Sequence, residues 1–311
     1  MRPRLSFVVP VFNAGAFLRE AVDSIRTETG NLADFEILLV DDCSNDTETL
    51  RLLDSLAAEP DIRCIRQPRN AGPAVARNAG LAAAAGDWIS FLDADDVLAP
   101  GAIRARFEVM HAIPAATWLM GDIYRVTAPG RFEDGDFPAF LESGTRVLPG
   151  VIEHANPVDV LLKSARVPQV GTAMIRRDVI ERVGGFDDTL RYSEDWLFWL
   201  TIGLTEPLYW LQTPTVHLRR YNESMTKNRL ADAGAGPLAP TRALGDPRFA
   251  AWRKPLRWRL AQEWRRYSST NLDHGRRVQA AAGALNALRW VPNDVRNFNA
   301  LRAALSPRSA R

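Results

Sequence analysis

The first hundred residues alternate between short β-rich runs and stretches with helical spacing, and this alternation limits the fold more than any other feature. The β-rich runs are LSFVVPVF, FEILLVDD, IRCIRQ and DWISFLDADD, all within residues 5–96. Between them, apolar side chains recur three and four positions apart, as in Leu18, Val22 and Ile25, which indicates amphipathic helices. Strands that alternate with helices predict βαβ units and a parallel sheet.

Acidic side chains gather where these predicted strands end. Asp41 and Asp42 close the second run, and Asp93, Asp95 and Asp96 follow the fourth. Ligands of open parallel sheets bind beyond the carboxyl ends of the strands, so we expect these acids to face one crevice. Carboxylates this close repel one another unless a cation lies between them. A divalent cation that carries phosphate oxygens would explain the cluster; a solvated loop that caps the next helix is the simpler alternative.

Beyond residue 115 the alternation is less regular. We expect strands in TWLMGDIYRV and GTAMIRR, a short helix in VDVLLKS, and irregular structure over residues 128–155. RDVIERVGGF and EDWLFWLTIGL are expected to be helices, and LYWLQTPTVHLRRY to hold two short strands. Two helix boundaries are also predicted, an N-cap at Asn13 and a helix end at Gly86.

Several protein classes are excluded by missing motifs. There is no G-x-G-x-x-G after the first strand and no G-x-x-x-x-G-K-[ST], which argues against dinucleotide-binding Rossmann enzymes and P-loop NTPases. An EF-hand that starts at Asp93 would need Gly and Glu where the chain has Leu98 and Arg104. Two cysteines imply no disulfide framework, and no apolar run reaches the roughly 18 residues of a membrane-spanning helix. We therefore expect a cytoplasmic protein whose N-terminal run is a strand rather than a signal peptide.

Four segments, taken together in their order and spacing, resemble the family 2 inverting glycosyltransferases of the GT-A fold. They are FVVPVFNAGAFLREAVDSI, FEILLVDDCSNDT, RNAGPAVARNAGLAAAAGDWISFLDADD and GGFDDTLRYSEDWLFWLTI. The resemblance implies an α/β fold, GT-A-like, with a Rossmann-like and mostly parallel sheet flanked by helices. It also implies a nucleoside-diphosphate sugar donor, commonly UDP- or dTDP-linked, and a divalent metal, Mg²⁺ or Mn²⁺.

By this resemblance, one group of residues would contact the nucleotide sugar. They are Pro10, Phe12, Asn13, Asp41, Arg77, Asp93, Asp95 and Arg220. Asp41 would accept a hydrogen bond from the base, with strand-end capping as its alternative role. Asp96, together with Asp95, would ligate the metal, which stabilises charge on the leaving diphosphate.

The resemblance also places a catalytic acid in the second half of the chain. Asp195, beside Glu194, matches the general base of the family's ED motif. Inverting transfer needs such a base to take the proton of the acceptor hydroxyl, and capping of the following helix is compatible with that role. His217 is a candidate metal ligand, with a purely structural role as the alternative. Gln169 is a candidate acceptor contact, and Arg219 a candidate partner of the diphosphate.

Charge is distributed unevenly along the chain. Net charge is +2, but residues 246–311 hold 14 Lys and Arg against 4 Asp and Glu, which leaves an acidic body. Trp252, Trp258 and Trp264 lie among these arginines. A solvated helical face and peripheral attachment to anionic lipid both fit this composition. Nucleic-acid binding is not expected, because no accompanying module is present.

The resemblance implies an inverting, metal-dependent glycosyltransferase that adds one sugar per event to a glycan or lipid-linked acceptor in cell-surface polysaccharide or glycolipid assembly. The alternative is a non-catalytic nucleotide-sugar-binding protein or scaffold with the same fold. The predicted catalytic domain covers residues 1–230, with a donor half over 1–100 and an acceptor half over 101–230. A linker over 231–247 and a basic helical tail over 248–311 would follow. The protein would be cytoplasmic, or peripheral at the inner face of the membrane.

Overall fold

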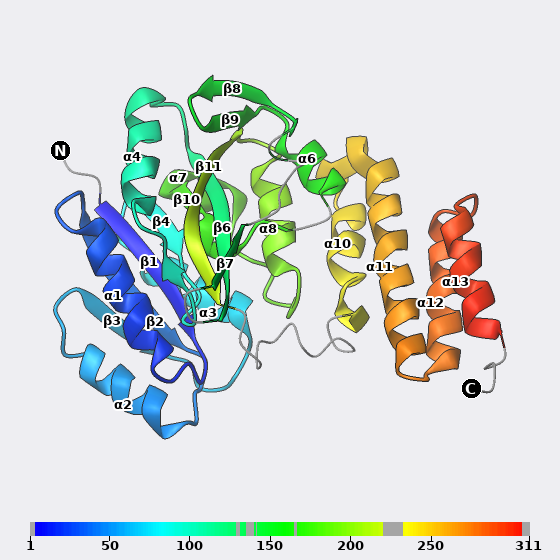
Figure 1. Cartoon of the computed structure of the whole chain (residues 1–311), viewed down its shortest axis with the longest axis horizontal. Coiled ribbons are helices and arrows are strands. Elements are labelled where there is room, and N and C mark those ends of the chain that lie inside the picture. The colour runs from blue at the N-terminus through cyan, green and yellow to red at the C-terminus, as the bar shows by residue number, and fades with distance from the viewer. Residues whose placement is uncertain are drawn as a thin grey trace. The chain divides into compact units, whose positions relative to one another are not determined.

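The computed structural model describes residues 4–128, 131–134, 140, 142–164, 167–219 and 233–306 (Figure 1). The chain forms two compact units, which are described separately. The first unit comprises Met1–Thr189 and Phe198–Asn222, and the second comprises Leu190–Leu197 and Glu223–Arg311.

The first unit begins with four parallel strands. β1 (Arg4–Val11) lies between β2 (Asp34–Asp41) and β4 (Trp88–Phe91), and β3 (Ile62–Arg66) pairs with β2. The apolar side chains of β1 from Leu5 to Val9 are fully buried. Burial along the whole strand is typical of parallel sheets that are covered on both faces. The predicted βαβ alternation is therefore confirmed for this half.

Three helices connect these strands: α1 (Phe17–Thr29), α2 (Thr47–Leu56) and α3 (Pro73–Ala83). A fourth helix, α4 (Ala102–Ala112), comes after the acids that follow β4. α3 packs on β1 and β2, while α1 contacts α2, α4 and the short strand that follows the acids (Figure 1). The prediction that the third helix ends at Gly86 is wrong, since α3 ends three residues earlier. Gly86 is instead required by close approach, because a Cβ there would lie 2.6 Å from the main-chain nitrogen of Ser6.

The sheet becomes mixed after β4. β10 (Met174–Arg176) pairs antiparallel with β4 and with β6 (Trp118–Ala128). β11 (Leu208–Arg219) pairs parallel with β6 and antiparallel with β5 (Val97–Leu98). The strand order is β3-β2-β1-β4-β10-β6-β11, and β5 pairs at the side of β11; two further strands continue the sheet beyond β11, and one more pairs with β6. A wholly parallel sheet, as the first hundred residues suggested, is thus limited to the first four strands.

Two expectations for the middle of the chain are wrong. LYWLQTPTVHLRRY contributes one strand, β11, because register shifts on either side of Pro214 absorb the proline without ending the strand. The segment expected to be irregular contains β7 (Arg131–Asp134), β8 (Thr145–Leu148) and β9 (Val151–His154). Gly150 lies between β8 and β9 with a φ of 72°, so glycine in this segment forms a hairpin turn and does not indicate irregular structure.

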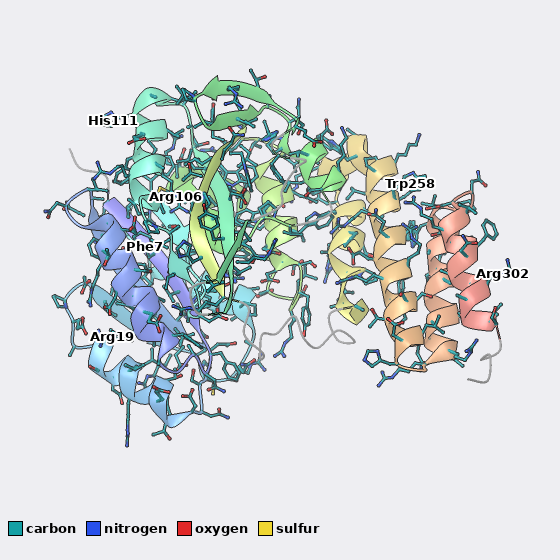
Figure 2. The ribbon with its side chains drawn as sticks, in the orientation of Figure 1. Phe7, Arg19, Arg106, His111, Trp258 and Arg302 are labelled. Carbon is teal, nitrogen blue, oxygen red and sulfur yellow. The ribbon has the colours of Figure 1, made fainter. Side chains whose placement is uncertain are left out.

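The helices α6 (Pro157–Lys163) and α7 (Arg177–Val183) follow the prediction. Between them, the 3₁₀ turn η1 (Val170–Thr172) leads into β10. Arg106 of α4, labelled in Figure 2, is fully buried and donates a hydrogen bond to the carbonyl oxygen of Thr172 (2.9 Å). Burial lowers the pKa of Arg106 to about 10. This contact ties α4 to the turn before β10.

The second unit is helical. It contains α10 (Leu238–Gly245), α11 (Arg253–Asp273), α12 (Arg277–Trp290) and α13 (Val295–Leu305), with a 3₁₀ segment over Pro247–Trp252. α10 lies inside the segment expected to be a linker. Its buried alanines provide packing that the Gly- and Pro-rich composition did not reveal. The domain boundaries themselves stay a prediction. No helix within the described ranges is both long and apolar enough to cross a membrane.

Candidate functional site

The acids that follow β4 form a tight turn. The main-chain N–H of Asp96 donates to the carbonyl oxygen of Asp93 (3.0 Å), and the chain then enters β5. Asp96 is only 3% exposed, and its Oδ1 accepts a hydrogen bond from the N–H of Arg219 at the end of β11 (2.9 Å). The orientation of Asp96 therefore depends on a residue 123 positions further along the chain.

Burial and mutual repulsion raise the pKa values of two of these acids. Asp95 has an exposed side chain, yet desolvation by the surrounding atoms, and then the charge of Asp93, raise its pKa to about 6. Burial, followed by the charges of Asp95 and Asp93, holds the pKa of Asp96 well above its usual range. A nearby cation would favour the charged forms that burial and repulsion disfavour.

The acidic turn has the right ligand chemistry for a hard divalent cation. Mg²⁺ and Mn²⁺ prefer oxygen ligands, and Mg²⁺ usually takes one or two carboxylates together with substrate phosphates. Asp95 and Asp96 therefore fit a cation whose other ligands are phosphate oxygens and water. Among the residues that the structure describes, no group of three or more His, Cys, Asp and Glu side chains is arranged to hold a metal.

Arg219 contacts the acidic turn through both its main chain and its side chain. Besides the bond to Asp96, its Nη1 donates to the carbonyl oxygen of Asp95 (3.3 Å), and its Nη2 pairs with Glu20 of α1. Its guanidinium lies 4.9 Å from the ring centre of Phe17. The sequence suggested only a partner for the diphosphate. The tie between α1, the acidic turn and β11 was missed, because it depends on the pairing of β5 with β11.

Arg77 reaches the same turn from α3. It is buried, and its Nη2 donates to Oδ1 of Asp93 (2.8 Å). Its guanidinium also lies 5.5 Å from the ring centre of Phe186. The structure thus brings together Arg77 and Asp93, which both come from the predicted donor contacts. Arg220, another predicted donor contact, lies outside the described residues.

The loop after β1 is joined to the loop after β2 by Asn13. Its Oδ1 accepts hydrogen bonds from the N–H groups of Asn45 (2.9 Å) and Asp46 (3.2 Å), and its Nδ2 donates to Oδ1 of Asn45 (2.9 Å). Asn13 has a φ of 51°, a left-handed conformation that asparagine tolerates better than most residues. The predicted N-cap at Asn13 is wrong, since α1 begins at Phe17 with Ala16 as its N-cap.

Two other predicted contacts lie on the same strand end. Pro10 lies where β1 extends beyond β4, whose pairing stops at Val8, so the missing N–H of the proline is tolerated there. Phe12 is exposed and presents an aromatic ring that can stack on a planar group.

The adjacent acids Asp41 and Asp42 accept hydrogen bonds from different segments of the chain. Oδ1 of Asp41 accepts a hydrogen bond from the N–H of Ser44 (2.9 Å), which is the capping role considered as an alternative. Both oxygens of Asp42 accept main-chain bonds, from the N–H groups of Ala71 and Gly72 (2.8 Å each). Asp42 therefore holds the loop before α3 against the end of β2. The sequence contained no signal for this role beyond the acid itself.

The predicted base lies at the start of α8 (Glu194–Ile202). Ser193, the residue before it, has a φ of 60°, which is uncommon for a residue other than glycine. Oδ1 of Asp195 accepts a hydrogen bond from the N–H of Trp196 (2.7 Å), and Glu194 is buried. The ring of Trp196 lies 5.4 Å from the guanidinium of Arg259, within the second unit. The catalytic roles of Asp195 and Glu194 stay predictions.

The remaining two candidates are His217 and Gln169. His217 lies opposite Val97 in the β5–β11 pairing, and its ring centre is 5.7 Å from that of Tyr124. Burial, and then the charge of Arg219, lower the pKa of His217. Gln169 precedes η1, where its carbonyl oxygen accepts a hydrogen bond from the N–H of Thr172 (3.0 Å). Metal ligation by His217 and acceptor contact by Gln169 stay predictions.

The family model described as Glycosyl transferase family 2 matches residues 6–184. The chain belongs to this family. The matched region contains the acidic turn, Asp41 and Arg77, and it ends before Asp195 and Arg219. The resemblance seen in the sequence is thereby confirmed.

Curated relatives agree with this assignment. The succinoglycan biosynthesis protein ExoO of Rhizobium meliloti is 30% identical over 200 residues, which cover 63% of this chain and 54% of that protein. EpsJ of Bacillus subtilis, an uncharacterized glycosyltransferase, is 38% identical over 201 residues, with the same coverage of 63% and 54%. The match thus spans about half the length of these relatives.

Solved structures confirm the fold. S. aureus TarS 1–349 aligns with a TM-score of 0.63 at 18% identity, over 97% of this chain and 90% of that chain. The same protein in complex with UDP-GlcNAc aligns with a TM-score of 0.65 at 16% identity, with the same coverage. A mannosyltransferase, PcManGT from Pyrobaculum calidifontis in complex with GDP-Man and Mn²⁺, has a TM-score of 0.56 at 19% identity, over 98% and 86%. The predicted α/β, GT-A-like fold with C-terminal helices is therefore confirmed.

Proposed function

We propose that this protein is an inverting, metal-dependent glycosyltransferase that moves a sugar from a nucleoside-diphosphate sugar to an acceptor hydroxyl. The observation that carries the proposal is the acidic turn after β4, in a chain of glycosyl transferase family 2. Acids with raised pKa values in contact with arginines are typical of functional sites. The complexes of TarS with UDP-GlcNAc and of PcManGT with GDP-Man and Mn²⁺ support a donor and a metal of this kind.

The strand ends supply the parts of a donor site. Phe12 stacks on the base, and Asp41 accepts a hydrogen bond from it through the oxygen that does not bind Ser44. Asp95 faces the ribose, and Asp96 holds the cation together with Asp95. A bound Mg²⁺ or Mn²⁺ would act as a Lewis acid on the leaving diphosphate. Arg77 fixes Asp93, and Arg219 fixes the orientation of Asp96.

Asp195 acts as the general base in this proposal. It takes the proton of the acceptor hydroxyl as that oxygen forms its bond to the anomeric carbon. The bond from the anomeric carbon to the diphosphate breaks, and the diphosphate leaves with its electron pair. Attack from the face opposite the leaving group inverts the configuration.

The substrates follow from the same reasoning. A UDP- or dTDP-linked donor is proposed from the family resemblance, and the acceptor is a glycan or a lipid-linked glycan. Relatives named for succinoglycan biosynthesis and for O-antigen biosynthesis support a role in cell-surface polysaccharide or glycolipid assembly. We place the protein in the cytoplasm or at the inner face of the membrane, and we expect one sugar to be added per event.

Calorimetric titration of UDP, dTDP and GDP into the full chain tests the donor site. We expect one diphosphate to bind in the presence of Mn²⁺ or Mg²⁺ and to lose most of its affinity in EDTA. Asp96→Asn should abolish the metal dependence, while Glu108→Gln, on the exposed part of α4, serves as a control that keeps it. If the folded protein binds none of the three diphosphates, the donor-site proposal is wrong.

The competing function is a non-catalytic nucleotide-sugar-binding protein or scaffold with this fold. The ED acid speaks against it, because a protein that only binds the nucleotide sugar uses the acidic turn but needs no general base. Asp195→Asn should abolish transfer while leaving nucleotide binding nearly intact. Undiminished turnover in that variant would remove Asp195 as the base.

A further inference from the structure

Helix α12 buries small apolar residues inside the second unit and exposes two larger ones on its other side. Its buried face consists of Ala280, Gly283, Ala284 and Ala287. At Gly283 the approach to α11 is so close that a Cβ would lie 2.7 Å from a ring carbon of Tyr267. The opposite face presents Val278 and Leu285, seven positions apart, and Leu285 is 55% exposed.

Helix α13 also exposes large apolar side chains, and its buried side contains a polar residue, Asn297. Nδ2 of Asn297 donates to the carbonyl oxygens of Ala287 (3.1 Å) and Val291 (2.7 Å), and Arg265 of α11 donates to Oδ1 of Asn297 (2.6 Å). The outward face presents Phe298, which is 53% exposed. Two further exposed residues share that face at helical spacing, Val295 and Leu305. The packing of α13 therefore leaves its largest apolar side chain, Phe298, exposed.

The exposed charges on these two helices are all positive. Between Arg277 and Leu305 the chain has four arginines, at positions 277, 289, 296 and 302. The one acid in that stretch, Asp294, is buried and paired with Arg265 and Arg296. Arg302 lies at helical spacing from Val295, Phe298 and Leu305 and projects away from α13 in Figure 2. The outer faces thus combine apolar side chains and arginines without a carboxylate.

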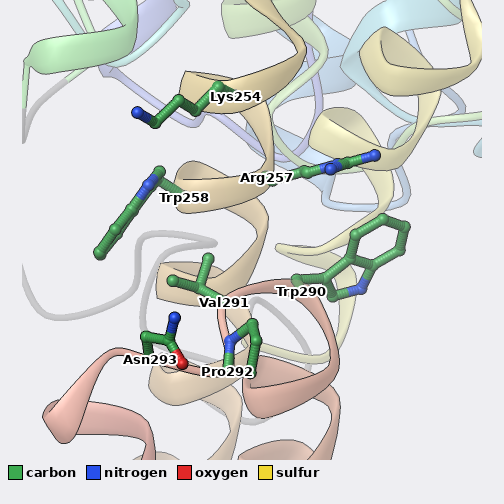
Figure 3. Close-up of a pocket in the computed structure, with 7 residues that line it drawn as sticks. All are labelled: Lys254, Arg257, Trp258, Trp290, Val291, Pro292 and Asn293. Carbon is green, nitrogen blue, oxygen red and sulfur yellow. The ribbon is translucent and has the colours of Figure 1, made fainter.

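The first half of α11 adds more charge of the same sign. A hollow there is lined by Lys254, Arg257, Trp258, Trp290, Val291, Pro292 and Asn293 (Figure 3). Two of these residues are cations, two are tryptophans and none is acidic. Tryptophan, lysine and arginine have an apolar body and a polar end, and side chains of this type are favoured where lipid meets water.

We propose that the outer faces of α12 and α13 bind the surface of an anionic lipid bilayer. The large apolar side chains enter the headgroup region, and the arginines extend to the lipid phosphates. The positive charge of the second unit draws it toward anionic lipid. The proposal names the surface for the peripheral contact suggested above, and it does not depend on the chemistry of the donor site.

A second copy of this chain fits these faces less well. A two-fold contact would bring arginines of both copies into one desolvated interface that contains no carboxylate to pair with them. Anionic lipid supplies the missing negative charge, and the apolar side chains gain burial in either case. Charge complementarity therefore favours the bilayer.

Co-sedimentation of the full chain with vesicles of phosphatidylcholine, with and without phosphatidylglycerol, tests the proposal. We expect binding only to the anionic vesicles, and weaker binding at high salt. The double variant Leu285→Ser with Phe298→Ser should lower the partition coefficient at least about tenfold, because two buried apolar side chains are lost. Leu238→Ser removes a similarly exposed leucine (50%) from α10 and should leave the partition coefficient unchanged.

Two variants that each remove one arginine distinguish an effect of the outer faces of α12 and α13 from an effect of net charge alone. Arg302→Gln should weaken binding to anionic vesicles, whereas Arg51→Gln, an exposed arginine of α2, should not. Equal binding by the double variant and the unmodified chain, or equal binding to both kinds of vesicle, would overturn the proposal. A dimer in sedimentation velocity that the double variant loses, without vesicle binding, would assign these faces to a second copy instead. UDP titrations on the same variants report the donor site independently, so failure of this proposal is distinguishable from failure of the proposed function.

Discussion

Replacing Asp96 with asparagine should stabilise the metal-free protein and at the same time remove its response to a divalent cation. The side chain is 3% exposed, and burial, together with the charges of Asp95 and Asp93, holds its pKa well above the usual range. Asparagine has nearly the same shape, lacks the charge, and keeps an oxygen that can accept the N–H of Arg219. The burial and the neighbouring charges that favour cation binding by Asp96 therefore lower the free energy of unfolding when no cation is bound.

The sign and size of the effect follow from linkage. A carboxyl whose pKa is raised by folding binds its proton more tightly in the folded state than in the unfolded chain. The free energy of unfolding therefore falls by about 1.4 kcal/mol per pH unit from about pH 3.9 up to the folded-state pKa. The pKa of Asp96 is raised even though the N–H of Arg219 favours the charged form, so the net balance favours a neutral side chain. Leaving a buried polar group without a compensating partner typically costs about 1–3 kcal/mol, so at pH 7 we expect a gain of that order and a rise of a few degrees in melting temperature.

Thermal unfolding at pH 7, in EDTA and again with Mn²⁺ and UDP, measures both parts of the prediction. The unmodified chain should melt higher with Mn²⁺ and UDP, because ligands that bind only the folded state stabilise it. Asp96→Asn should melt higher in EDTA and show no further rise. Asp93→Asn is the control with the opposite sign, since it removes the carboxylate that pairs with buried Arg77. A lower melting temperature of Asp96→Asn in EDTA would refute the reasoning, and an unchanged response to Mn²⁺ would refute the metal role.

Two further predictions concern residues outside the acidic turn. Asp42→Ala should lower the free energy of unfolding by about 2–5 kcal/mol, because the part-buried N–H of Ala71 and the buried N–H of Gly72 each lose their acceptor. Urea denaturation measures this, and a loss below about 1 kcal/mol would contradict it. Hydrogen bonds from Arg26 hold the pKa values of Asp61 and Glu59 below their usual range. These ion pairs therefore stabilise the folded protein above about pH 4, and this stabilisation is lost as the pH falls through the lowered folded-state pKa values. Arg26→Gln should therefore lower the melting temperature at pH 7 and flatten its decline below pH 4, and an equally steep decline in the variant would show that this cluster is not the cause.

Much of the fold of the first unit could be predicted from sequence because its signals are local. The period of apolar residues distinguishes strands from helices, and the connection of each strand through a helix to the next implies parallel pairing. The same rule placed Asp41 and the acids of 93–96 at one edge of the sheet. The family match over residues 6–184 covers this region.

Errors occurred where the outcome depends on packing rather than on local pattern. Asn13 looks like an N-cap, yet its left-handed conformation turns its side chain to the loop after β2. LYWLQTPTVHLRRY was expected to hold two strands, but pairing of β11 with β6 on both sides of Pro214 continues the strand past the proline. α10 forms in a stretch of linker composition because its alanines are buried.

The sequence by itself determined the βα alternation, the acids at the strand ends and the basic C-terminal helices, since each depends on residues close together in the chain. Only the tertiary structure decided that Arg219 orients Asp96, that Asp42 holds the loop before α3, and that α12 and α13 have large apolar side chains outside. Each of these outcomes depends on which distant segments pair and in what register. Register is set by the sum of many long-range contacts, and no single stretch of sequence contains that sum.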